Sequence, residues 1–169
     1  LYRVHLTSTS GNMNVELKGI CFDSRKVQPG FLFIAIKGTL SDGHAFIEKA
    51  ITLGAVAVVA ENLPSTISDK VTYITVKDSA KALGMIASNF YGNPSSKLKL
   101  VGVTGTNGKT TVATLLFKLF SSLDYRCGML STVVNRIVDK EFQATHTTPD
   151  PIQINELLVK MIQEKCTHC

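Results

Sequence analysis

The chain has 169 residues, a net charge of +5 and a hydrophobic fraction of 44%. This length suits one domain or two small ones, and the hydrophobic fraction excludes a disordered chain. No apolar run approaches the roughly 20 residues that a membrane span needs. The first residues also lack the apolar segment and cleavage site of a secretory signal. We therefore expect a soluble, cytoplasmic protein with no membrane partner.

The charges are spread along the chain rather than clustered. The sequence contains eighteen lysines and arginines and thirteen acidic residues, and it has neither a basic run nor aromatic residues interleaved with basic ones. This pattern argues against a nucleic-acid partner and favours a small anionic ligand such as a nucleotide. Four cysteines without a signal peptide indicate reduced thiols rather than a disulfide framework. We expect a monomer that acts on small molecules.

Short apolar runs alternate with helical patterns in the first half of the chain. The runs at 18–22, 31–36, 55–60 and 71–76 predict strands, each bordered by turn-forming or polar residues. Helices are predicted at 44–53 and 78–91, where apolar residues recur at helical spacing. Five turn-forming residues at 92–96 then break the pattern. The predicted organisation is a domain at 1–92, a linker at 93–97 and a second domain at 98–169.

The second half repeats the alternation. A strand is predicted at 98–103 and a helix at 109–123, followed by a strand at 127–134. Asp150 and Pro151 are typical of the first positions of a further helix. The alternation predicts an α/β fold with parallel sheets. A further strand is expected where the chain stops, at 166–169, so we interpret the sequence as a fragment truncated inside its second domain.

A glycine-rich loop lies between the predicted strand at 98–103 and the predicted helix at 109–123. Its glycines, Gly105 and Gly108, leave room for several backbone N–H groups to converge on a polyphosphate, and the helix N-terminus adds partial positive charge. Lys109 would reach the β- and γ-phosphates, and the Thr110 hydroxyl is placed to bind Mg²⁺. The spacing departs from the general P-loop, which would put a glycine at Val103. A tight turn with a solvated lysine is the weaker alternative.

Three motifs resemble one family of enzymes. Residues 105–111, Gly-Thr-Asn-Gly-Lys-Thr-Thr, resemble the ATP loop of the Mur ligase family, which also includes folylpolyglutamate and cyanophycin synthetases. Residues 22–33 and 38–43 resemble the UDP-binding N-terminal domain of its MurE-type members. Residues 144–150 resemble the threonine pair with which those members contact the muramoyl substrate. The resemblance covers nearly the whole chain from about Leu17.

The resemblance implies a fold and a reaction. The fold is a small N-terminal α/β UDP-binding domain followed by a truncated P-loop parallel-sheet ATP-binding domain. The reaction adds a third amino acid, L-lysine or meso-diaminopimelate, to UDP-N-acetylmuramoyl-L-alanyl-D-glutamate through an acyl phosphate, with ATP cleaved to ADP and phosphate. It belongs to peptidoglycan precursor synthesis, and so to cell-wall biogenesis, cell shape and cell division. Members of the family place a second Mg²⁺ site, a carbamoylated lysine and the amino-acid pocket beyond the region matched here, so we expect the 169 residues alone to be inactive.

The resemblance also assigns roles to individual residues. The residues expected to bind ATP are Gly105, Thr106, Asn107, Gly108, Lys109, Thr110 and Thr111, with Lys109 as the catalytic cation and Thr110 as the Mg²⁺ ligand. The residues expected to contact the uridine or the muramoyl moiety are Phe22, Ser24, Thr39, Leu40, Ser41, His146, Thr147 and Thr148. His146 stands where relatives often have asparagine.

Two other functions remain open from the sequence. One is a different P-loop enzyme, such as a small-molecule kinase, and the other is a nucleotide-binding scaffold without ligase chemistry. Cys166 and Cys169 have redox or zinc-site spacing, but a second ligand pair is missing, so buried strand residues are favoured. His44 is interpreted as a helix-start residue rather than a base, and Cys21 and Cys127 as core residues.

Overall fold

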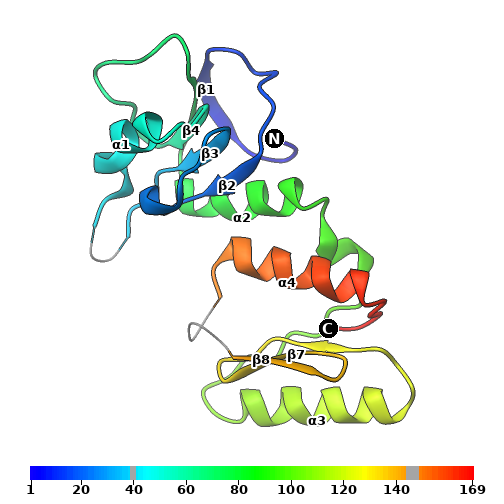
Figure 1. The fold of residues 1–169 in the computed structure, drawn as a ribbon. Helices are drawn as coiled ribbons and strands as arrows, with labels where there is room; N and C mark the ends of the chain where they lie inside the picture. Colours follow the sequence, from blue (N-terminus) through cyan, green and yellow to red (C-terminus); the bar gives the residue numbers. More distant parts are fainter. Residues whose placement is uncertain (39–40, 144–148) are drawn as a thin grey trace. The chain divides into compact units, whose positions relative to one another are not determined.

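The computed structural model describes residues 1–38, 41–143 and 149–169, and it divides into two compact units, Leu1–Phe90 and Tyr91–Cys169 (Figure 1). Each unit is described by itself below. The segment predicted as a linker, 93–97, belongs to the second unit and contains a short 3-10 helix, η3 (Pro94–Lys97), that packs against helix α4 (Pro151–Gln163).

The first unit is built on a five-stranded sheet with the order β1-β5-β4-β3-β2. Strands β2 to β5 run parallel, and β1 pairs antiparallel with β5 at the edge. The strands are β1 (Leu6–Ser10), β2 (Gly19–Cys21), β3 (Phe31–Ile34), β4 (Ala57–Ala60) and β5 (Thr72–Val76). Because β2 to β5 are parallel, their carboxyl ends lie along one edge of the sheet.

Helices cover both faces of this sheet. The unit contains the 3-10 helices η1 (Ser24–Lys26) and η2 (Gly43–Phe46) and the α-helices α1 (Ile47–Thr52) and α2 (Ser79–Phe90). On one face, Phe33, Val58 and Tyr73 form a core with Ile47 and Ala50 of α1. On the other face, residues of the middle strands line an apolar cavity together with Ile86 of α2; they are Leu32, Ala57, Thr72 and Ile74. Side chains alternate between two covered faces, which explains the unbroken apolar runs.

The four strands and the long helix predicted in this unit are confirmed, with no end shifted by more than two residues. The helix predicted at 44–53 begins instead as η2 and becomes α-helical at Ile47. Strand β1 was not predicted. All five of its residues are exposed, so it carries no apolar pattern that would indicate a strand.

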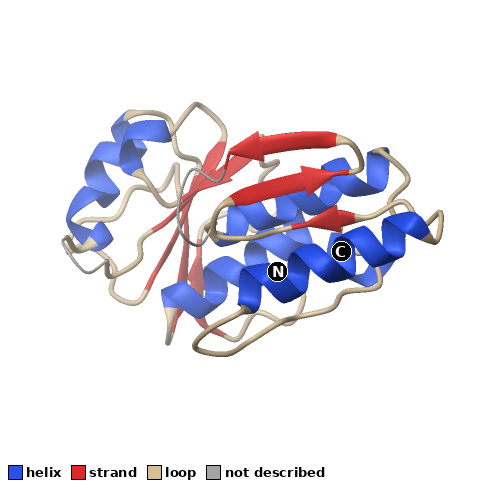
Figure 2. Ribbon diagram, turned by 90° about the horizontal axis from the view of Figure 1, so that it is seen from below, coloured by secondary structure: helices blue, strands red, loops and turns tan. Residues whose placement is uncertain are grey.

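The second unit contains two long helices and a small antiparallel sheet (Figure 2). The helices are α3 (Lys109–Ser122) and α4, and the sheet has the order β6-β7-β8, with β6 (Gly128–Met129), β7 (Val134–Ile137) and β8 (Lys140–Gln143). The predicted start of α4 is confirmed, because the Asp150 carboxylate accepts the N–H groups of Ile152 and Gln153, both at 2.9 Å. Figure 1 shows α3 and α4 on opposite sides of these strands.

Two predicted strands of the second unit are wrong in extent. The segment 98–103 is not a continuous strand, and its only parallel bridge among the described residues joins Lys99 to His168. The strand predicted at 127–134 ends at Met129, and the chain turns before β7 begins at Val134. His168 also bridges Cys127 in parallel, so the chain end at 166–169 lies between the two segments. The α/β class is confirmed, and the parallel pairing found among the described residues of this unit consists of these bridges.

The apolar residues of α3 divide between two environments. Ala113, Leu116, Phe117 and Phe120 line an apolar cavity with residues of β6 and α4. Leu115, on the neighbouring stripe, is 60% exposed, and Val112, Leu119 and Leu123 are also exposed. Within the described ranges, no helix has the length and apolar character needed to cross a membrane.

Candidate functional site

The glycine-rich loop lies at the start of α3 and is exposed to solvent. Gly105 and Gly108 adopt φ values of +147° and +77°, a region that side chains disfavour. A Cβ atom at Gly108 would meet no protein atom within 4 Å. The chain therefore needs glycine here for its backbone conformation rather than for room inside the protein. The loop leads directly into the helix, whose first-turn N–H groups have no partners from the preceding helical turn.

Lys109 is the first residue of α3 and its side chain folds back over the loop. Its ammonium donates hydrogen bonds to the carbonyl oxygens of Gly105 and Thr106. Thr110 follows on the helix and is half-buried, whereas Thr106, Asn107 and Thr111 are exposed. The loop and the first turn of α3 thus bring together a cation, several backbone N–H groups and a hydroxyl. This combination of groups can bind a phosphate chain and its metal ion.

A second group of predicted site residues follows β2. Phe22 is half-buried, and Ser24, in η1, is only 7% exposed. The Asp23 carboxylate caps η1 by accepting the N–H of Arg25 at 3.0 Å, and it pairs with the Arg25 guanidinium at 2.8 Å. The hydrogen bond from the Arg25 side chain is the main reason that the pKa of Asp23 falls to about 2. Asp23 therefore stays ionised and fixes the turn that carries Ser24.

The loop after β3 reaches the same edge of the sheet. Its base is closed by the N–H of Gly38 on the Ser41 carbonyl at 2.9 Å and by the N–H of Gly43 on the Ile36 carbonyl at 2.8 Å. Ser41 is exposed. Thr39 and Leu40 lie outside the described residues, as do His146, Thr147 and Thr148. Because β2 and β3 are neighbours, the topology brings Ser24 and Ser41 to adjacent strand ends.

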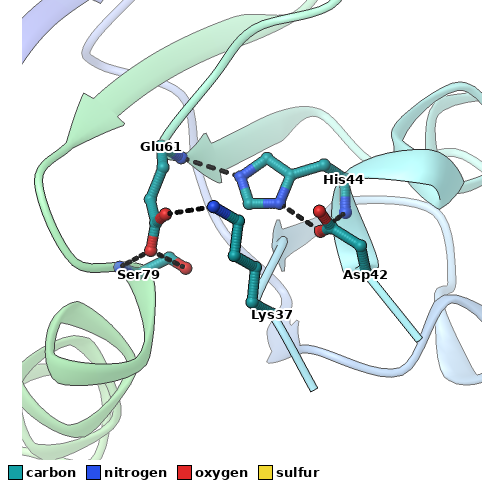
Figure 3. A network of polar contacts seen from close by, with 5 residues as sticks. All are labelled: Lys37, Asp42, His44, Glu61 and Ser79. Carbon is teal, nitrogen blue, oxygen red and sulfur yellow. Dashed lines mark hydrogen bonds and ion pairs between the residues drawn. The ribbon is translucent and has the colours of Figure 1, made fainter. Parts of the chain in front are cut away.

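A polar network that sequence reasoning missed surrounds the base of this loop (Figure 3). It contains Lys37, Asp42, His44, Glu61 and Ser79, which come from four separate segments of the first unit. His44 lies in η2, as a helix-start residue, and was expected to do no more than begin a helix. The only sequence indication was positional, because Lys37, Glu61 and Ser79 each follow a predicted strand closely.

The four cysteines are free thiols in buried or half-buried positions. The described residues contain no group of three or more histidine, cysteine, aspartate or glutamate side chains that could hold a metal ion. Cys127 and Cys166 are buried, and burial raises the pKa of the Cys169 thiol to about 11. The ring of His168 packs against Phe120 and Tyr125, at centroid distances of 5.0 and 4.7 Å. The expectation of buried strand residues therefore holds for Cys166, whereas Cys169 is half-buried and the segment pairs through isolated bridges at His168.

Two family models match successive parts of the chain. Residues 16–91 match the Mur ligase family, catalytic domain, and residues 103–169 match the Mur ligase middle domain. The two matches together cover most of both units, and each falls largely within one of them.

Similar proteins carry consistent names. The UDP-N-acetylmuramoyl-L-alanyl-D-glutamate–2,6-diaminopimelate ligase of Cytophaga hutchinsonii is 61% identical over the whole chain, and that of Phocaeicola vulgatus is 52% identical over 94% of it. The chain spans 35% and 33% of these two relatives, about a third of their length.

Solved structures show the same relationship. A ligase of the same name aligns with 90% of this chain and 31% of its own, at a TM-score of 0.75 and 29% identity. The MurF ligase from Thermotoga maritima, in complex with ADP, aligns with 85% of this chain and 30% of its own, at a TM-score of 0.57 and 27% identity.

Proposed function

Because this chain belongs to the Mur ligase family, we propose that its protein joins 2,6-diaminopimelate to UDP-N-acetylmuramoyl-L-alanyl-D-glutamate in an ATP-dependent reaction. The sequence left L-lysine and meso-diaminopimelate open as the added amino acid. The names of the similar ligases favour diaminopimelate. The product is a UDP-linked muramoyl tripeptide, a precursor of peptidoglycan.

The observation that carries the proposal is the loop at 105–111 at the N-terminus of α3. Its positive-φ glycines, the adjacent Lys109 and the helix N-terminus provide a site for the phosphates of ATP. The ammonium of Lys109 balances charge on the β- and γ-phosphates, and Thr106, Asn107 and Thr111 complete the loop around them. The MurF ligase from Thermotoga maritima, which has a similar fold, was solved in complex with ADP, and this supports the binding of an adenine nucleotide by the present chain.

The residues of α3 also fit a magnesium ion. Mg²⁺ usually takes one or two protein oxygens and completes its shell with water and substrate phosphates. The half-buried hydroxyl of Thr110, next to Lys109, is a suitable single protein ligand, and a cluster of carboxylates is not needed. When bound, the ion would neutralise charge on the transferred phosphoryl group.

The first unit is assigned to the UDP end of the substrate. Phe22 and Ser24 after β2, and Thr39, Leu40 and Ser41 after β3, contact the uridine in this proposal. β2 and β3 are parallel neighbours, and nucleotides commonly bind at the carboxyl ends of such strands, which supports the assignment. His146, Thr147 and Thr148 are assigned to the muramoyl moiety on the resemblance alone.

The reaction has two steps. The substrate carboxylate attacks the γ-phosphorus of ATP, forms an acyl phosphate and releases ADP. The amine of the incoming amino acid then attacks the acyl carbon, forms the amide, and expels phosphate. Lys109 acts in the first step, by electrostatic stabilisation of the charge that builds up on the phosphoryl oxygens.

The test is an assay of phosphate release by the full-length protein. We expect release only when ATP, Mg²⁺, the UDP-linked dipeptide and diaminopimelate are all present, with the tripeptide identified by mass spectrometry. Replacement of diaminopimelate by lysine tests the choice of amino acid. Phosphoryl transfer to a small molecule without amide formation would support a kinase instead, and nucleotide binding without turnover would support a scaffold.

A further inference from the structure

Three polar residues meet at the carboxyl edge of the parallel sheet in the first unit. Lys37 follows β3, Glu61 follows β4 directly, and Ser79 begins α2 after β5. Glu61 lies between the other two (Figure 3). One of its carboxylate oxygens accepts the N–H and the hydroxyl of Ser79, at 3.1 and 3.2 Å, and the other pairs with the Lys37 ammonium at 3.5 Å.

Glu61 is thereby fixed as an anion. The N–H of Ser79, at the N-terminus of α2, is the largest cause of the lowered pKa of Glu61. Ser79 itself is fully buried. The backbone of Glu61 therefore holds a defined position between the end of β4 and the start of α2.

His44 forms a hydrogen bond with the backbone of Glu61. The N–H of Glu61 donates to Nε2 of His44 at 3.0 Å, and Nδ1 of His44 lies 2.6 Å from an Asp42 carboxylate oxygen. An imidazole nitrogen that accepts an N–H cannot carry a proton. The ring is therefore the Nδ1–H tautomer, which donates to Asp42, and both nitrogens are engaged.

Asp42 connects the ring to the loop after β3. The same carboxylate oxygen accepts the N–H of His44 at 2.9 Å, and Asp42 forms a backbone bridge with Lys37. A Cβ atom on the neighbouring Gly43 would come within 2.7 Å of the Ile36 carbonyl oxygen. The base of the loop is thus held in two ways. Its backbone packs closely against the residues that follow β3, and His44 accepts a hydrogen bond from Glu61, directly after β4.

We propose that His44 is a positioning residue that fastens the base of the 38–43 loop to the end of β4 and so sets the affinity for the uridine nucleotide part of the substrate. The inference rests on the proposed function, which places Ser41 of this loop at the uridine. His44 takes no part in proton transfer in this proposal. Its whole effect passes through Asp42 and the backbone of Glu61.

Two substitutions of His44 separate its two contacts. In His44→Asn the shorter amide can still donate to Asp42 but no longer reaches the Glu61 N–H. In His44→Gln the longer side chain places an amide oxygen near the position of Nε2 and keeps that contact. His5→Gln, at an exposed histidine of the same unit, is the matched control.

The experiment measures KM for the UDP-linked dipeptide, KM for ATP and kcat in the full-length protein. We expect His44→Asn to raise the KM for the UDP substrate about tenfold, because the hydrogen bond that fastens the loop is lost. The KM for ATP and kcat should stay within about twofold, and His44→Gln should restore most of the affinity. In the wild type, ¹⁵N shifts of the His44 ring should show the proton on Nδ1.

The outcomes distinguish this inference from the proposed function. If the wild type does not bind the UDP-linked dipeptide, both fail. If it binds, and His44→Asn leaves that KM unchanged or shifts both KM values equally, only the role of His44 is overturned. Asp42→Ala, at a half-exposed side chain, provides a second variant should His44→Asn not fold, and it must weaken binding of the UDP substrate in the same selective way.

Discussion

The ammonium of Lys109 donates a hydrogen bond to the carbonyl oxygen of Gly105, four residues earlier in the chain. A second donation, to Thr106, holds the same ammonium above the loop at 3.2 Å. The cation is therefore already positioned over the backbone that would surround a phosphate chain.

The first prediction concerns this cation. Lys109→Met should weaken ATP binding by the full-length protein about tenfold to a hundredfold, because a hydrogen bond to a charged group is lost at the phosphates. Isothermal titration calorimetry with a non-hydrolysable ATP analogue measures the change. Lys118→Met, at an exposed position of the same helix, is the control and should bind normally. Equal affinity in the two variants would remove Lys109 from the nucleotide site.

The sequence predicted those elements whose stability comes from local patterns. The apolar runs of β3 and β4 are buried on both faces, and Asp150 followed by Pro151 marked the start of α4. The turn between β7 and β8 was missed because Val138 occupies it with a φ of +54°, a conformation in which valine is rare. Asp139, the other residue of the turn, was the single turn-forming residue there, which is a weak signal by itself.

The glycine-rich loop before α3 could be located from sequence because all its parts are contiguous. The network around His44 could not, because its contacts join residues 17 and 18 positions apart and depend on the strand order. The hydrogen bond between His44 and Glu61 follows only once β3 and β4 are known to be parallel neighbours. Tertiary topology, not residue type, brings these groups together.

The second prediction concerns acid stability and Asp23. Its pKa in the folded state, about 2, lies below the usual value of 3.8, so Asp23 stabilises the fold above about pH 4 and loses this contribution as the pH falls toward 2. The effect should be at most about 1 kcal/mol, because the partner Arg25 is 80% exposed. Asp23→Asn should flatten this part of a plot of unfolding free energy against pH. Asp69→Asn, at an exposed aspartate of the same unit, serves for comparison, and an identical slope in both variants would contradict the pairing.

The third prediction compares two glycines of the first unit. Gly54 has a φ of +101°, and a Cβ atom there would lie 2.8 Å from the backbone of Pro29. Gly54→Ala should therefore lower the free energy of unfolding by at least about 1 kcal/mol. Gly84 lies inside α2 with nothing within 4 Å of a Cβ atom, so Gly84→Ala should raise it by about 0.5–1 kcal/mol. Urea unfolding measures the change in unfolding free energy for each variant, and changes of the same sign in the two variants would refute this prediction.

The last prediction concerns the chemistry of the cysteine pair at 166 and 169. Burial raises the pKa of Cys169 to about 11 and also raises that of Cys166, so both remain thiols at neutral pH. Only thiolates react readily, so alkylation of the folded protein by iodoacetamide should be slow at pH 7.5. The rate at Cys169 should rise about tenfold per pH unit until the pH approaches its pKa. Urea-unfolded protein should react much faster at pH 7.5, as peptide mapping by mass spectrometry can show. Rapid alkylation of the folded chain, or a disulfide formed in a glutathione buffer, would instead identify a redox-active pair.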